Sequence, residues 1–247
     1  MKHKPIFRLS LLALLLAGCG KDTTELPEGP PATGGDAIVC RLSIGNEAPD
    51  PTDETRTAYG PLQDGYYPIY WRNADRVGII CPQTTPQWAE VEVSVSGATE
   101  SEADLSDTGM AWGSDPHYDF YAFYPADAVQ TNSGSIVVTA IPAVQTCNNG
   151  ECNMQYAYMA ACTQGVERGG EVPFRFRPLM TTVTADVRFS EAAEVQKLVL
   201  SSENDPVAGA FTFDIETHRA AVIEDRSSKV LALHMLTGEE PYIRIAA

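Results

Sequence analysis

The sequence has few cationic residues and few histidines, and both shortages narrow its possible functions. Of 247 residues, 17 are Lys or Arg, 33 are Asp or Glu and four are His, which gives a formal net charge of −16. A chain this acidic repels nucleic acids and anionic lipids, so neither is expected as a ligand of the folded part. Beyond the N-terminus, His117, His218 and His234 are scattered and have no sequence partner at catalytic spacing.

The motifs of common enzyme classes are also missing. The chain has no HExxH zinc motif, no P-loop and no dinucleotide-binding glycine fingerprint, and Gly113-Ser114-Asp115 is not part of a nucleophile elbow. Glu102, Asp104 and Asp107 form an acidic cluster without the spacing of a known calcium loop, which favours a solvated loop. We therefore predict no catalytic residues, no metal and no cofactor, and a protein that is not an enzyme.

Outside the first 18 residues, no apolar run is long enough to span a membrane. Residues 9–17 are apolar and follow Lys2, Lys4 and Arg8, which is the order of a signal peptide. The next motif, Leu16-Ala17-Gly18-Cys19, resembles the lipobox of bacterial lipoproteins. The resemblance implies removal of residues 1–18, acylation of Cys19 and a lipid anchor in the outer membrane that does not cross it.

Five cysteines remain beyond Cys19, and an odd number outside the cytoplasm permits at most two disulfides. Cys147 and Cys152 flank Asn-Asn-Gly-Glu, a spacing that fits neither a zinc ribbon nor a redox CxxC motif. Unpaired loop thiols, a small-loop disulfide and metal ligands remain the alternatives for this pair.

The order of composition along the chain predicts a tether followed by β-structure. Residues 19–36 are polar and rich in Pro and Gly, as in a flexible spacer. From Ala37 onward short β-rich runs alternate with turn clusters, and Val91, Val93 and Val95 alternate with polar residues. We expect an all-β fold of antiparallel sandwiches, with an N-terminal domain over 37–170 and a second domain over 171–247 that stops within strand-like sequence.

Two aromatic segments indicate how that core is built. Trp71 and Ile79 are predicted to face the core on either side of a turn that Asp75 caps. In residues 118–124 aromatic side chains fall on both faces of the expected strand. This pattern fits a central strand covered on both sides, or a strand with one face covered by a partner.

Several motifs, taken in order, resemble the fimbrillin family of Bacteroidetes lipoproteins over about residues 38–245. They are Thr55-Arg56-Thr57, a Trp-x-x-x-Asp-Arg-x-Gly segment at residues 71–78, an aromatic strand ending in Tyr124-Pro125, Ile141-Pro142 with Gln145, and residues 156–160. Members of this family are pilus subunits and tip proteins with two transthyretin-like β-sandwich domains. The resemblance implies a surface-exposed fimbrial subunit, cap or anchor that supports adhesion, with other fimbrial subunits as partners and a receptor still unknown.

The same resemblance suggests how subunits assemble. In polymerising members an arginine-specific protease removes the N-terminal segment, and a strand of another subunit fills the exposed groove by β-strand addition. Arg41 lies within strand-like sequence and Arg56 in a polar segment, so these are the candidate cleavage positions, with ordinary surface arginines as the alternative. The family's second domain continues further than this sequence does, which leaves a capping or truncated subunit open.

The alternative function is an outer-membrane lipoprotein that binds glycans. Tethered β-sandwiches with exposed aromatic residues also serve that role. Trp88 and Trp112 are the candidate stacking residues for sugar rings.

Overall fold

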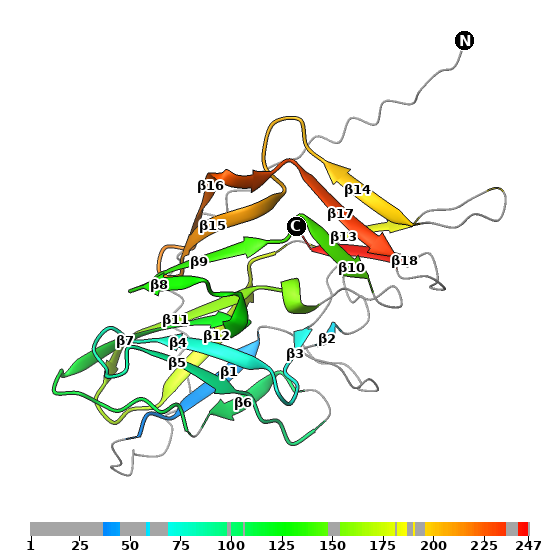
Figure 1. The fold of residues 1–247 in the computed structure, drawn as a ribbon. Helices are drawn as coiled ribbons and strands as arrows, with labels where there is room; N and C mark the ends of the chain where they lie inside the picture. Colours follow the sequence, from blue (N-terminus) through cyan, green and yellow to red (C-terminus); the bar gives the residue numbers. More distant parts are fainter. Residues whose placement is uncertain are drawn as a thin grey trace. The chain divides into compact units, whose positions relative to one another are not determined.

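The computed structural model describes residues 37–44, 58–59, 69–97, 100–105, 107–147, 154–180, 182–186, 190, 196–235 and 242–246. All of them belong to one compact unit, Ala32–Ala247. Their regular elements are β-strands, drawn as arrows in Figure 1, and two short 3₁₀-helices, η1 (Ala126–Ala128) and η2 (Met154–Tyr156). The described part contains no helix long and apolar enough to cross a membrane. The prediction of an all-β, largely antiparallel fold is confirmed.

The largest sheet has seven strands, and it includes the first strand of the described chain. Its strand order is β5 (Trp88–Glu92), β4 (Arg76–Ile80), β7 (His117–Tyr124), β11 (Met159–Glu167), β12 (Val172–Pro178), β1 (Cys40–Ile44) and β6 (Glu102–Leu105). Neighbouring strands run antiparallel except for β1 and β12, which run parallel.

Four smaller sheets complete the described strands. The four-stranded sheet has the order β16 (Arg219–Ser228), β15 (Ala208–Asp214), β9 (Ile136–Ile141), β8 (Thr131–Ser133), and the three-stranded sheet the order β10 (Val144–Cys147), β17 (Val230–Met235), β14 (Lys197–Ser201). The two-stranded sheets are β13 (Thr182–Asp186) with β18 (Tyr242–Ala246), and β2 (Ala58–Tyr59) with β3 (Ile69–Tyr70).

Strand β7 lies between β4 and β11 and is covered on both faces. Tyr118, Phe120 and Tyr124 belong to one buried cluster, whereas Tyr121 and Phe123 belong to a second. Because all five are buried, the two-sided aromatic pattern is explained by packing within the chain. Of the two sequence interpretations, the central strand is correct.

The second cluster joins the seven-stranded and four-stranded sheets face to face. Phe211 and Phe213 of β15 pack in it with Tyr121 and Phe123 of β7. Tyr158 contributes to the same cluster, and its hydroxyl donates a hydrogen bond to the carbonyl oxygen of Ala140 on β9 over 2.6 Å. This arrangement is sandwich-like, as the sequence predicted.

Hydrogen-bonded strands cross the predicted domain boundary at residue 170. Strand β12 follows that residue yet pairs with β11 and β1, and β9 precedes it yet pairs with β15. The division into domains 37–170 and 171–247 stays a prediction.

Candidate strand-assembly site

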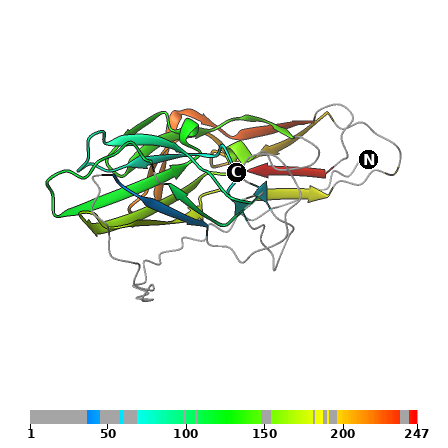
Figure 2. The same cartoon turned by 90° about the horizontal axis from the view of Figure 1, so that it is seen from below.

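Strand β1 is bound by main-chain pairing along both of its edges. It runs parallel to β12, with Leu42 opposite Phe174, and antiparallel to β6, with Leu42 opposite Ala103. The N–H of Ile44 donates a hydrogen bond over 2.8 Å to the carbonyl of Ser101, the residue directly before β6. Figure 2 shows β1, in blue, beside the yellow-green β12. An N-terminal strand therefore lies inside the sheet and not at its edge.

The side chains of β1 alternate between core and solvent. Cys40, Leu42 and Ile44 are buried in the larger core cluster, while Arg41 is exposed and Ser43 half-buried. Removing a fully buried Leu or Ile side chain from water contributes about 1.5–3 kcal/mol. Because three of its five side chains point inward, β1 contributes substantially to the larger core cluster. A strand that replaced β1 would need the same alternation of buried and exposed side chains.

Arg41 bridges the two strands that flank β1. Its Nε lies 3.1 Å from Oδ1 of Asp104 on β6, and its Nη2 lies 3.2 Å from Oε1 of Glu171, which directly precedes β12. The hydrogen bond with Asp104, with a further contribution from the charge of Glu171, raises the pKa of Arg41. All three side chains are largely solvent-exposed, so each ion pair contributes at most about 1 kcal/mol.

Ser43 makes a second polar link between β1 and β12. Its hydroxyl donates a hydrogen bond to the carbonyl oxygen of Phe174 over 3.2 Å. Both outward residues of β1 therefore contact its neighbours in the sheet.

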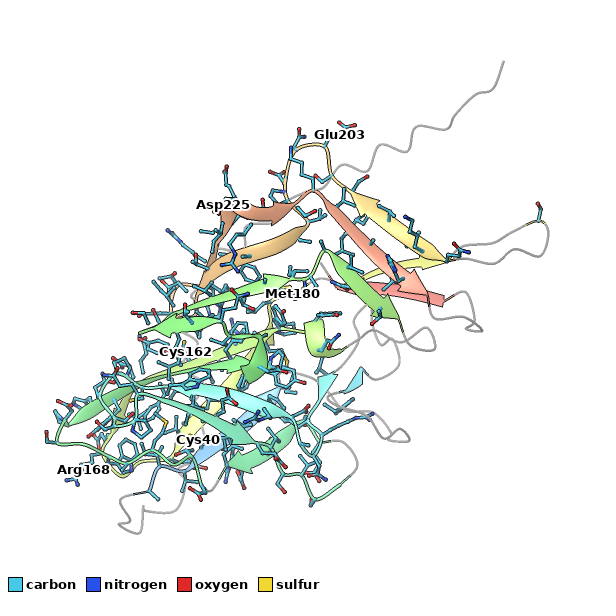
Figure 3. The ribbon with its side chains drawn as sticks, viewed as in Figure 1. Cys40, Cys162, Arg168, Met180, Glu203 and Asp225 are labelled. Atoms are coloured by element: carbon cyan, nitrogen blue, oxygen red, sulfur yellow. The ribbon has the colours of Figure 1, made fainter. Side chains whose placement is uncertain are left out.

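Two thiols are buried in the core beside this strand. Cys40 of β1, labelled in Figure 3, and Cys81, which follows β4, are free cysteines of the same cluster. Burial, with a smaller contribution from Cys81, raises the pKa of the Cys40 thiol to about 12. Burial also raises the pKa of Cys81, whose Sγ lies 3.3 Å from Oε1 of Gln83. Both thiols therefore stay protonated in the folded protein and are poor nucleophiles.

Several predicted site residues lie outside the described part of the chain. They are Cys19, Arg56 and Cys152; the backbone of Cys147 ends β10, but its side chain is not described. Acylation of Cys19, cleavage after Arg56 and the pairing of Cys147 with Cys152 stay predictions.

The two candidate stacking tryptophans are packed to different extents. Trp112 is 7% exposed and makes edge-to-face contacts with Tyr118 and Phe120. A sugar could stack on Trp112 only after this packing was displaced. Trp88 is half-buried on β5 and packs against the second core cluster and the backbone of Gly78. A glycan-stacking role for either residue stays a prediction.

The acidic cluster is where the sequence interpretation needs correction. Glu102 and Asp104 lie on strand β6 and not in a loop, because Ala103 and Leu105 alternate with them and are buried. The sequence pattern that could have predicted this strand is the alternation Glu-Ala-Asp-Leu. It is easily missed because it is only four residues long and half of them are acidic. Asp107 accepts a hydrogen bond from the N–H of Gly109 over 3.2 Å. Among the described residues, no group of three or more His, Cys, Asp or Glu is placed to hold a metal ion.

One of the comparisons with known proteins, the match to a family model, agrees with the family resemblance seen in the sequence. A family model described as fimbrillin-like matches residues 55–239. No curated protein matches the chain. Among solved structures, the chain is similar to a Bacteroides ovatus protein proposed to act in cell adhesion, with 12% identity and a TM-score of 0.47 over 85% of this chain and 76% of that one.

Proposed function

This chain belongs to the fimbrillin-like family, and we propose that it is a non-enzymatic subunit of a cell-surface fimbrium that assembles by β-strand addition at the position of β1. The observation that carries the proposal is the place of β1: an N-terminal strand with a buried apolar face, paired on both edges within the seven-stranded sheet. We further propose that the subunit is held at the outer membrane by lipid on Cys19.

Loss of β1 would create a site of defined shape. The backbone groups of β12 and β6 that now pair with β1 would lose their partners, and the core around Phe174 would lose its cover. Unpaired backbone groups and exposed apolar side chains are both costly in water. A strand of a neighbouring subunit with apolar side chains at alternate positions would satisfy both requirements, which is the principle of β-strand addition.

Of the two candidate cleavage positions, Arg56 suits this mechanism better. It lies between β1, which ends at Ile44, and β2, which begins at Ala58, so a cut after Arg56 separates the whole of β1 from every later strand. Arg41 lies within β1, where pairing on both sides keeps the backbone from a protease cleft. A cut there would also leave Leu42, Ser43 and Ile44 attached to the rest of the chain.

Exchange of single arginines for lysine tests the cleavage step. An arginine-specific protease is applied to surface fractions of cells that carry the wild type, Arg56→Lys or the matched control Arg41→Lys. We expect SDS-resistant ladders and a new N-terminus at Thr57 for the wild type and for Arg41→Lys, and neither for Arg56→Lys. The proposal is wrong if protease-treated wild-type protein remains monomeric and keeps only the N-terminus at Cys19.

The anchor is tested separately. Cys19→Ala is expected to lose incorporation of labelled palmitate and to leave the membrane fraction. A variant that still acquires the label would place acylation elsewhere in the chain.

A further inference from the structure

The three-stranded sheet of β10, β17 and β14 has one face in the core and one apolar face in solvent. On β17, Leu231 and Leu233 are 0% and 1% exposed and pack in a core cluster. On the opposite face Val144, Val199 and Val230 are 54%, 46% and 45% exposed. These are three of the six large apolar side chains that are exposed among the described residues, so half of that set lies on one small sheet.

The strand registers bring these side chains together into one patch. Ala232 of β17 lies opposite Val144 of β10 on one side and opposite Val199 of β14 on the other. Val230 is two residues from Ala232 on β17 and therefore on the same face. The next row consists of Thr146, His234 and Lys197. An apolar patch with a polar rim is typical of a protein interaction surface.

The patch extends to an unpaired sheet edge. Within the described chain, no strand pairs with the outer edge of β14. The N–H of Ser202 donates to the carbonyl of Lys229 across the β14–β17 ladder over 3.0 Å. Because backbone groups alternate in direction along a strand, those of Lys197, Val199 and Ser201 point away from β17 and toward that edge.

Strand β14 carries fewer charges than three other edge strands of the described chain, β5, β6 and β16. Natural edge strands carry charges that discourage pairing with another chain. Strand β5 carries two glutamates, β6 a glutamate and an aspartate, and β16 four charged residues, whereas β14 carries one lysine at its end. Figure 3 places Glu203 in the turn beyond β14, outside the strand itself.

We propose that β14 pairs antiparallel with β14 of a second copy of this chain, centred on Val199. In this register Val199 faces Val199 of the second copy, and Lys197 faces Ser201, so no like charges are opposed. The outward backbone groups of Lys197, Val199 and Ser201 then pair with the same groups of the other copy. Because both copies use the same strand, the contact is closed and two-fold.

A second copy of this chain is the partner that the sequence of β14 favours, because β14 can pair with itself without placing like charges opposite each other. Pairing joins the two rows of Val144, Ala232 and Val199 into a single apolar stripe across six strands. A contact of this kind needs neither cleavage of the N-terminal segment nor loss of β1. It would therefore link subunits side by side, independently of strand addition at β1.

Disulfide trapping with variants that each gain one cysteine tests the geometry. The full chain is purified in detergent with its N-terminal segment intact, so that assembly at β1 does not contribute. Residues opposite each other in a hydrogen-bonded antiparallel pair have Cα atoms about 5.5 Å apart, within disulfide range. Val199→Cys should therefore give a covalent dimer on mild oxidation that the wild type with its own cysteines does not give.

Val144→Cys is the matched control, since it lies on the same face and is at least as exposed. In the proposed dimer the two copies of residue 144 are five strand spacings apart, about 24 Å, and cannot be joined. Cross-linking of both variants would indicate face-to-face packing and overturn the edge pairing. Absence of cross-linking for Val199→Cys would overturn it as well.

A charge at the centre of the pair provides an independent measurement. Val199→Lys would place two ammonium groups directly opposite each other, while Val144→Lys would keep them far apart. Sedimentation of the uncleaved protein should show dimer loss only for Val199→Lys, with unchanged circular dichroism in both variants. A monomeric wild type, or equal dimer content in the wild type and Val199→Lys, would contradict the proposal.

Discussion

Tyr124 and Asp75 are joined by a buried hydrogen bond in which the tyrosine hydroxyl donates to Oδ1 of the aspartate over 3.0 Å. The other carboxylate oxygen of Asp75 accepts from the backbone N–H of Arg72 over 2.8 Å. A single carboxylate thus fixes the turn before β4 and connects it to the end of β7. Trp71 lies at the same place, with its ring edge-to-face on Tyr124.

Removing this carboxylate should be among the most destabilising polar changes in the described chain. Asp75→Ala leaves the Tyr124 hydroxyl and the Arg72 N–H without their acceptor, and hydrogen bonds to charged groups contribute about 1.5–3 kcal/mol each. We expect the free energy of unfolding, measured by urea denaturation, to fall by at least about 2 kcal/mol. Tyr124→Phe, which removes one of these hydrogen bonds, should cost about 1.5–3 kcal/mol. Asp115→Ala, at an exposed aspartate, is the control; an equal loss there would contradict the role of Asp75.

The contact between Gly78 and Trp88 gives a second prediction. A Cβ at residue 78 would overlap the indole ring of Trp88. Gly78→Ala should therefore displace the ring, lower the stability by about 1–3 kcal/mol and shift the tryptophan emission.

A double-mutant cycle separates this clash from an effect on the backbone. In a Trp88→Ala background the ring is absent, so Gly78→Ala should then cost a few tenths of a kcal/mol. A cost that is the same in both backgrounds would show that the backbone of Gly78, and not the ring, determines the effect.

Local patterns in the sequence predicted some of these features and could not predict others. The turn capped by Asp75 and the inward direction of Trp71 and Ile79 were predicted because each depends on residues a few positions apart. The position of β1 between β6 and β12 was not, because its partners lie about 60 and 130 residues further along the chain. Pairing between strands this far apart in the chain produces no periodic pattern in the local sequence, so the sequence does not indicate which strands pair.

Strand β6 is a second element that the local sequence did not predict. As an edge strand it carries Glu102 and Asp104 on its exposed face, and these charges obscured the strand in the sequence. The contact of Asp104 with Arg41 could be predicted only once β1 and β6 were known to be neighbours.

The ion pairs of Arg41 should matter little for overall stability but should slow the loss of β1. Arg41→Gln, which removes two ion pairs, is expected to lower the free energy of unfolding by at most about 2 kcal/mol, and the difference should fade in 1 M salt. In protein cut after Arg56, the same variant should release its N-terminal fragment about fivefold faster, as followed by size-exclusion chromatography.

Arg76→Gln is the matched control for this measurement. Arg76 has the same side-chain exposure as Arg41, 55%, and pairs with Glu90 on β5, away from β1. It should leave the rate of release unchanged. Equal acceleration by both variants would mean that the loss of any surface ion pair loosens the fold, and the specific role of Arg41 would be lost.

Alkaline pH should destabilise the protein through its buried tyrosines. Burial raises the pKa of Tyr158 from 10.0 to about 12, and the pKa of Tyr121 also rises to about 12. Below pH 10 the folded and unfolded states both keep these protons. Between pH 10 and 12 the unfolded state loses them while the folded state retains them, so the free energy of unfolding falls as pH rises.

Tyr158→Phe removes one of these titrations and so makes the dependence on pH shallower. At pH 8 the variant should be about 1 kcal/mol less stable than the wild type, because the carbonyl of Ala140 loses its donor. By pH 12 the two stabilities should converge or cross, since a pKa difference of two units corresponds to about 2–3 kcal/mol. Phe123→Leu, a change in the same core cluster without a titrating group, should shift the whole curve in parallel. Parallel curves for Tyr158→Phe would show that its hydroxyl does not titrate differently in the folded protein.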